Sequence, residues 1–261
     1  MDPATLIGIT LGIVSLLALM IMEGSSPMAI VLLPPLILVF GGTFGAAIAG
    51  SAMADVKKIG AWFKMALMPA KVPPVSDRIA TLVSLAEKAR KEGLLALEAQ
   101  VKDIDNPFLK RGLQMGIDGT DPEELRQVLE GEITAKKGED KVAAKFFTAM
   151  GGYAPTIGII GTVVGLIHVL ENLSSPESLG PLIASAFVAT LWGVLSANAL
   201  FLPFGKRIKM IGNAEAARMD VIIEGVLAIQ SGANPRVVAT RLRSKTPAPG
   251  PTGVVSAKDA A

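Results

Sequence analysis

Two charge-free stretches, 146–170 and 178–205, contain the side chains whose types could carry out chemistry. Thr162 and Thr190 lie in the middle third of these stretches. Hydroxyl and carbonyl oxygens are hard ligands, suited to a small cation or an ordered chain of water. Threonine is also common in membrane helices, where its hydroxyl bonds the carbonyl four residues earlier. The sequence therefore indicates an ion pathway, with local helix structure as the alternative.

Prolines and small residues accompany these hydroxyls. Pro155 and Pro203 each remove a backbone N–H, which either frees a carbonyl for an ion or only kinks the helix. Small residues recur every four positions, at Gly158, Thr162, Gly161 and Gly165 on the first stretch and at Ser185, Ala189, Gly193 and Ala197 on the second. This spacing is typical of closely packed membrane helices, and it would also admit a partner helix into a central bore.

Neither stretch contains an Asp, Glu, Lys or Arg residue. Transport of protons or sodium ions through helices requires a group that binds and releases the ion, usually a buried carboxylate. The chain is therefore either no conductor or one part of a conductor whose partner supplies the carboxylate. With no cysteine, one histidine and no phosphate-binding or nucleophile motif, we expect no enzyme, no cofactor, no metal site and no nucleic-acid partner.

Length and hydropathy predict that the two stretches are membrane spans. A helix rises about 1.5 Å per residue, so each stretch can cross roughly 30 Å of hydrocarbon. Two further apolar segments precede them, in a chain of 261 residues with a mean hydropathy of +0.51. We predict an all-α polytopic membrane protein with four transmembrane helices, at 4–22, 28–54, 146–170 and 178–205.

Charge segregation predicts the topology. Every Lys and Arg lies within 57–145 or 206–258, whereas the connectors 23–27 and 171–177 carry only acids. Because basic loops stay in the cytoplasm, both termini should face inside. We predict a helical cytoplasmic domain at 55–145, between spans 2 and 3. C-terminal cytoplasmic helices at 206–243 and a disordered tail at 244–261 complete the chain.

Periodicity and capping residues predict helices in the cytoplasmic regions. A helix over 76–101 would bury one apolar face, and 208–231 would form another helix. Thr120-Asp121-Pro122-Glu123 is a typical helix start, for a helix to about Lys137 with a kink at Gly138. Arg90 and Glu98 belong to a mixed-charge cluster on the first helix, either a solvated face or a docking surface.

Several separated motifs resemble the stator A subunits of the bacterial flagellar motor, the MotA/PomA family. The motifs are 89–98, 118–122, 152–166, 185–198, 201–203 and 228–236. The likeness extends from Ala4 to about Arg243 and is greatest for the shorter, PomA-like branch.

This resemblance implies a stator in the bacterial inner membrane that couples inward ion flow to rotation, motility and chemotaxis. Five A subunits, a homopentamer, would surround two copies of a single-span MotB/PomB-like B subunit. The B subunit would carry an intramembrane Asp and bind peptidoglycan, and the ring would turn the rotor switch protein FliG. The resemblance assigns Thr162, Thr190 and Ala189 to the ion pathway, Pro155 and Pro203 to coupling, and Arg90 and Glu98 to rotor contacts.

The coupling ion is predicted from one position at which this sequence differs from sodium-driven members of the family. Sodium-driven members resemble one another in having Thr-Thr where this chain has Ala189-Thr190. Loss of a hydroxyl removes an oxygen ligand that a dehydrated sodium ion requires, so we expect protons, with sodium as the alternative. Two other functions remain open, an ExbB/TolQ-like energiser and a non-conducting membrane scaffold. The four-span layout argues against the former.

Overall fold

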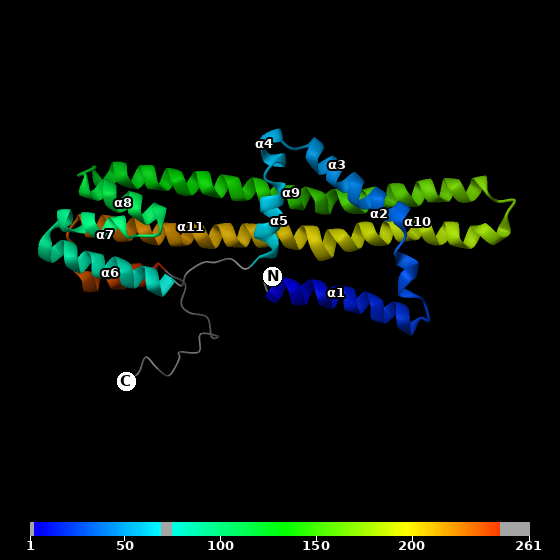
Figure 1. Ribbon diagram of the computed structural model, residues 1–261, viewed down its shortest axis with the longest axis horizontal. Helices are drawn as coiled ribbons and strands as arrows, with labels where there is room; N and C mark the ends of the chain where they lie inside the picture. The colour runs from blue at the N-terminus through cyan, green and yellow to red at the C-terminus, as the bar shows by residue number, and fades with distance from the viewer. Residues whose placement is uncertain (1–2, 69–74, 246–261) are drawn as a thin grey trace. The chain divides into compact units, whose positions relative to one another are not determined.

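The computed structural model describes residues 3–68 and 75–245, which are helices joined by turns, without a strand in these ranges. The prediction of an all-α fold is thereby confirmed for the described residues. The helices are α1 (Pro3–Met22), α2 (Leu33–Leu36), α3 (Gly42–Ala49), α4 (Met53–Val56), α5 (Ile59–Leu67), α6 (Val75–Glu92), α7 (Glu98–Lys102), α8 (Pro107–Ile117), α9 (Pro122–Glu171), α10 (Pro176–Ser196), α11 (Leu202–Gln230) and α12 (Pro235–Ser244) (Figure 1). The predicted tail, 244–261, lies outside the described residues except for its first two.

Four short turns complete the described secondary structure. Two are 3-10 turns, Pro27–Ile30 and Leu94–Leu97. Two are π-helical, Ile37–Gly41 between α2 and α3, and Ala197–Phe201 between α10 and α11. A π-helical turn widens the backbone locally and is found mostly within longer helices, often at functional sites.

The chain divides into two compact units. One, here called the apolar unit, consists of Met1–Ala70 and Gly138–Gly212. The other, here called the charged unit, consists of Lys71–Lys137 and Asn213–Ala261. Helices α9 and α11 contribute residues to both.

Three helices are long and apolar enough to cross a membrane, judged by length and composition within the described ranges: Pro3–Met22, Pro122–Glu171 and Pro176–Gln230. The predicted second span, 28–54, contains a shorter apolar helix, Leu33–Ala49. This helix begins at a Pro-Pro pair, because proline lacks an N–H and fits the first turn, where N–H groups have no helical acceptor. It ends at Gly50, whose backbone leaves the helical region.

Aromatic rings hold the apolar unit together where the first charge-free stretch begins and the second ends. Trp62 of α5 lies 5.5 Å from Phe146 of α9, measured between ring centroids. Its neighbour Phe63 packs edge-on against Phe147 at 4.8 Å. Phe147 in turn contacts Phe204 of α11 at 5.7 Å. This cluster fixes α5 against α9 and α11.

The charged unit has a core of aliphatic side chains. The predicted apolar face of α6 is confirmed, because its side chains at 79, 82, 85, 86 and 89 are buried and Val83 is half-buried. The predicted extent, 76–101, is wrong. Gly93 takes a φ of +85°, a left-handed conformation that favours glycine and ends a helix, so α6 stops at Glu92 and α7 starts afresh at Glu98.

Helix α9 begins as predicted but extends much further. The Asp121 carboxylate accepts hydrogen bonds from the backbone N–H groups of Glu123 and Glu124, at 2.9 and 3.3 Å, and Pro122 occupies the first helical position. The helix then passes without a break through Gly138 to Glu171. Glycine in a helix interior costs about 1 kcal/mol relative to alanine, too little to end so long a helix.

Helix α11 likewise starts earlier than the predicted 208, at Leu202, directly after a π-helical turn. Pro203 therefore lies inside the continuous helical run Pro176–Gln230, directly after the π-helical turn, where the hydrogen-bond pattern is already shifted.

Candidate functional site

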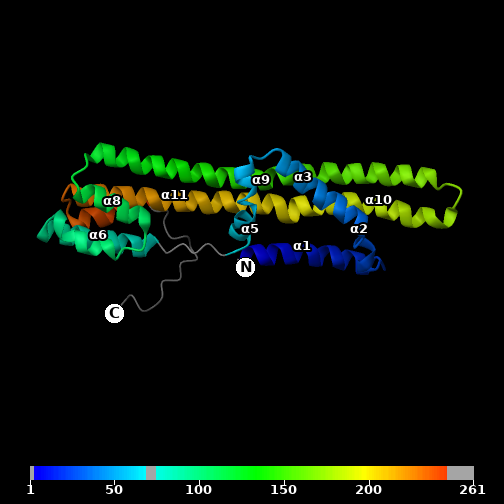
Figure 2. The ribbon, with the colours of Figure 1, turned by 45° about the horizontal axis from the view of Figure 1, so that its top comes forward.

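The C-terminal half of α9 and α10 form a helical hairpin. Both ribbon views show the two helices side by side along this half (Figures 1 and 2). They are joined by a short turn at 172–175, and α10 begins at Pro176.

Glycines allow the two helices to approach backbone to backbone. A Cβ on Gly158 would lie 2.8 Å from the carbonyl oxygen of Ala189, and one on Gly193 would lie 2.6 Å from that of Ala154. A Cβ on Gly165 would lie 2.6 Å from the Cβ of Ala186. None of these contacts leaves room for a side chain, so close packing of the small-residue stripes is confirmed.

At the centre of this contact the two predicted threonines meet. The hydroxyls of Thr162 and Thr190 contact each other across the helix pair. The Thr162 hydroxyl also lies 3.2 Å from the carbonyl oxygen of Ala186 and 3.3 Å from that of Gly158. The Thr190 hydroxyl lies 3.2 Å from the same Gly158 carbonyl. Both side chains are half-buried. The structure thus joins residues 28 positions apart into one polar cluster.

This threonine cluster contains more acceptors than hydrogens. Its four oxygens share only the two hydroxyl hydrogens, so at most two of the four contacts are hydrogen bonds at any moment. A cluster of this kind can accept a further hydrogen bond from water or hydronium, or ligate a cation. The local helix interaction considered as an alternative is also present, through the bond to Gly158.

Ala189 belongs to the helix contact and adds no oxygen side chain to the cluster. Its side chain is 2% exposed. A Cβ on Gly161 would lie 2.6 Å from the Cβ of Ala189, so this methyl group occupies the space that the glycine leaves. The Ala189 methyl group therefore packs against Gly161 and leaves no space there for a further ligand.

The two prolines lie in different helices, but their neighbours touch. Pro155 is inside α9, where it deprives the carbonyl of Gly151 of its helical donor. A Cβ on Gly151 would lie 2.6 Å from the Cγ of Leu202, the residue before Pro203. The backbone turn that Pro155 loosens thus packs on the side chain that precedes Pro203.

Arg90 and Glu98 lie in the charged unit, on different elements. Arg90 is near the end of α6 and Glu98 starts α7, with the Gly93 break between them. The prediction that both belong to one helix is therefore wrong. Both are exposed, and neither forms a hydrogen bond or an ion pair through its side chain within 3–68 and 75–245. They remain available for contact with a partner.

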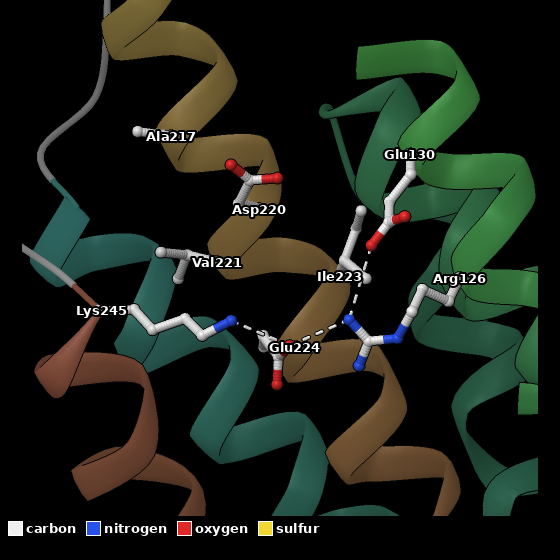
Figure 3. A pocket seen from close by; sticks show the side chains of 8 residues that line it. All are labelled: Arg126, Glu130, Ala217, Asp220, Val221, Ile223, Glu224 and Lys245. Atoms are coloured by element: carbon white, nitrogen blue, oxygen red, sulfur yellow. Dashed lines mark hydrogen bonds and ion pairs between the residues drawn. The ribbon is translucent and has the colours of Figure 1, made fainter. Parts of the chain in front are cut away.

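The sequence reading missed a buried carboxylate, Glu224 of α11. Its side chain is 5% exposed and binds three cations: Arg126 of α9 at 3.1 Å, Arg241 of α12 at 2.7 Å and Lys245 at 2.9 Å. Figure 3 shows Lys245 and Arg126 reaching Glu224 from opposite sides, in a cavity of about 240 Å³. The feature of the sequence that could have indicated it is the position of Glu224 as an isolated acid within the apolar run 221–229.

The electrostatics of Glu224 favour the charged form. Burial alone would raise the pKa of its carboxyl, but hydrogen bonds from Lys245 and Arg126, with the charges of Lys245 and Arg241, lower the pKa below its usual 4.5. The ionised carboxylate therefore ties α9 and α12 to α11 within the charged unit, which indicates a structural role.

Comparisons with known proteins agree with this arrangement. Residues 100–221 match the MotA/TolQ/ExbB proton channel family. The chain is 36% identical over 248 residues to motility protein A of Bacillus subtilis (strain 168), covering 95% of this chain and 92% of that protein. It is 34% identical over 247 residues to chemotaxis protein PomA of Vibrio alginolyticus, covering 94% and 95%.

Two solved structures have the same fold. The structure of C. jejuni MotAB matches with a TM-score of 0.91 and 32% identity, covering 96% of this chain and 98% of that chain. The flagellar MotAB stator complex from Bacillus subtilis matches with a TM-score of 0.88 and 35% identity, covering 94% and 96%.

The closely packed apolar hairpin, with oxygens at its centre, defines an ion-channel subunit of the membrane. The chain belongs to the MotA/TolQ/ExbB proton channel family, and within it to the flagellar stator subunits.

Proposed function

We propose that this stator ion-channel subunit conducts protons and that the threonine cluster forms part of their path. The observation that carries this proposal is the methyl group of Ala189, which fills its site by packing and offers no oxygen beside Thr190. A cation that sheds its hydration shell needs several oxygens in its place. A proton needs only a continuous chain of acceptors, which the two hydroxyls and carbonyls can provide together with water.

A partner must complete the pathway. The similar structures are complexes of an A-type chain with a MotB chain, which supports a MotB-type partner and a multimeric assembly. We propose a single-span B subunit whose intramembrane Asp reaches the threonine cluster. The lack of any acid in 146–170 and 178–205 supports this assignment, because the ion otherwise has no carboxylate to bind. We propose five A subunits around two B subunits.

The chain is a membrane protein, and we propose its topology from charge. Spans at 4–22, 28–54, 146–170 and 178–205 would place 55–145, 206–243 and the tail 244–261 in the cytoplasm, with both termini inside the bacterial inner membrane. Within the apolar unit, Leu33–Ala49 would cross as the second span with help from its flanking residues.

We propose that the prolines and the exposed charges transmit the effect of ion binding. The contact between Gly151 and Leu202 links the turns before Pro155 and Pro203, so a change at one turn would displace the other. Arg90 and Glu98 would act on the rotor protein FliG, since both are exposed and have no partner within the described part of the chain. We assign the subunit no enzymatic activity and no cofactor.

Swimming speed under defined ion gradients tests the coupling ion. Cells that depend on this stator should swim at full speed without sodium and stop when a protonophore collapses the proton gradient. Sodium-dependent, protonophore-resistant swimming would overturn the proposal. Replacement of the partner's intramembrane Asp by Asn should stop swimming under both conditions.

Cysteine labelling tests the topology without background, because the chain has no native cysteine. Ser25→Cys and Ser174→Cys should react in intact cells with a membrane-impermeant maleimide. Asp105→Cys and Lys137→Cys should react only after permeabilisation. Labelling of all four sites in intact cells would contradict the four-span arrangement.

A further inference from the structure

A second cavity, of about 250 Å³, lies wholly within the apolar unit, apart from the threonine cluster. Its apolar wall includes Ala47 of α3, Trp62 of α5 and Phe146 of α9. Its polar lining includes Asp55, Lys145 and Tyr153. The cavity therefore combines a hydrocarbon-like wall with one acid and one base.

The sequence places this cavity at the edge of the membrane. Asp55 is the first charged residue after the charge-free segment 28–54, and Lys145 is the last before 146–170. Trp62 and Tyr153 are of the two residue types that gather at membrane–water interfaces. The residues that end two separate apolar segments thus line one cavity.

The two charged side chains that line the cavity form no polar interaction with other described residues. Within 3–68 and 75–245, neither Asp55 nor Lys145 forms an ion pair or a hydrogen bond through its side chain, and they do not pair with each other. Lys58, nearby in sequence, pairs instead with Glu139 at 3.8 Å. Asp55 is half-buried and Lys145 is exposed, so both charges line the cavity without a counter-ion among the described residues.

We propose that the cavity binds the headgroup of a zwitterionic phospholipid that carries a primary ammonium group, such as phosphatidylethanolamine. The Lys145 ammonium binds the lipid phosphate, and Asp55 binds the lipid ammonium. The apolar wall accommodates the start of an acyl chain. A purely anionic lipid would satisfy Lys145 but would be repelled by Asp55, which is why the opposite charges favour the zwitterion. The proposal goes beyond ion conduction and rests on the membrane location of the apolar unit.

Native mass spectrometry of the assembled complex with its B subunit tests lipid binding directly. The purified complex is titrated with phosphatidylethanolamine or phosphatidylglycerol, and bound lipid is counted for each. The wild type should prefer phosphatidylethanolamine. Lys145→Gln should weaken binding of both lipids roughly fivefold, the effect of one basic side chain on an anionic headgroup. Asp55→Asn should abolish the preference between the two lipids.

Two control substitutions remove a charge outside the cavity. Lys141→Gln lies one turn before Lys145 on the same helix and is exposed, and Glu139→Gln removes a nearby carboxylate. Both should retain wild-type lipid binding. The same spectra report subunit stoichiometry, so a variant that fails to assemble is recognised at once.

Two outcomes overturn the proposal. One is a wild-type complex that binds the two lipids equally. The other is a change of subunit stoichiometry in the Asp55 and Lys145 variants with lipid preference intact, which would assign the cavity to a second copy of the chain. Either result leaves proton conduction untouched, because swimming and ion dependence are measured separately.

Discussion

The α9–α10 hairpin and the charged unit are both helical, yet they are stabilised by opposite means. In the hairpin the decisive residues are those with little or no side chain, and the polar groups at its centre interact with backbone carbonyls. In the charged unit, aliphatic side chains fill the core, and a buried carboxylate gathers three cations around it.

The surrounding solvent accounts for the difference. Lipid is as apolar as leucine, so apolar side chains gain little by leaving it, and membrane helices associate through close contact and hydrogen bonds. In water, burial of aliphatic surface supplies the driving force. Added side-chain volume should therefore destabilise the hairpin, whereas removal of a charged group should destabilise the charged unit.

The largest expected effect concerns function in the hairpin. Thr190→Val and Thr162→Val keep the side-chain shape and remove the hydroxyl, so each should reduce swimming at least tenfold while the complex still assembles. Thr156→Val is the matched control, because its hydroxyl is exposed and bonds only the Tyr153 carbonyl of its own helix. Swimming assays together with stoichiometry measure the effect. Normal swimming of both variants would favour the scaffold function.

Volume added to the hairpin should have the next largest effect. Gly158→Ala would place a Cβ 2.8 Å from a backbone oxygen of α10, which forces the helices apart at a cost of about 2 kcal/mol. Gly152→Ala on the same helix meets nothing within 4 Å and should retain or slightly raise the melting temperature. Thermal unfolding of the complex in detergent distinguishes the two. Equal melting temperatures would refute backbone contact as the source of hairpin stability.

Charge removal in the charged unit should have a smaller and pH-dependent effect. Glu224→Gln should destabilise the docking of α12 by about 1 kcal/mol at pH 7, since two of the three cations are half-exposed and water compensates part of the loss. The folded pKa of Glu224 is lowered, so its contribution is complete above about 4.5 and disappears as the pH falls through the lowered value.

Hydrogen exchange of α12 amides in the whole complex measures this contribution. Wild type and Glu224→Gln are compared at each pH, which cancels the intrinsic pH dependence of exchange. Their difference should shrink on acidification. Glu130→Gln, which removes an exposed partner of Arg126, should change α12 protection little. A difference that grows as the pH falls would show that Glu224 is not held ionised.

The smallest effect on stability is expected at the exposed charges. Arg90→Ala and Glu98→Ala should each change the free energy of unfolding by less than about 0.5 kcal/mol, because neither side chain has a partner within the described residues. Swimming should nevertheless slow, more so after charge reversal, if these residues contact the rotor. Unchanged swimming of the double reversal Arg90→Glu/Glu98→Lys would remove them from the rotor contact.

Much of this architecture could be predicted from local pattern. The buried face of α6 and the Asp121-Pro122 helix start depend on residues close in sequence, and the structure agrees with both. Of the four predicted apolar spans, three correspond to helices long enough to cross a membrane within the described ranges, and 28–54 contains a shorter one. The wrong predictions of helix boundaries arose at glycines, where the backbone can either leave the helix or continue it. The left-handed backbone of Gly93 ended a helix that periodicity extended, whereas Gly138 remained inside one.

The sequence by itself determined that Thr162 and Thr190 are polar groups within charge-free helices and that no acid accompanies them. Only the tertiary structure decided that the two hydroxyls meet, that Ala189 packs on Gly161 and that Glu224 binds three cations. The physical reason is the separation along the chain over which each kind of interaction acts. Hydropathy and helix periodicity act over a few residues, whereas these contacts join side chains far apart in the chain and depend on how closely the helix backbones approach.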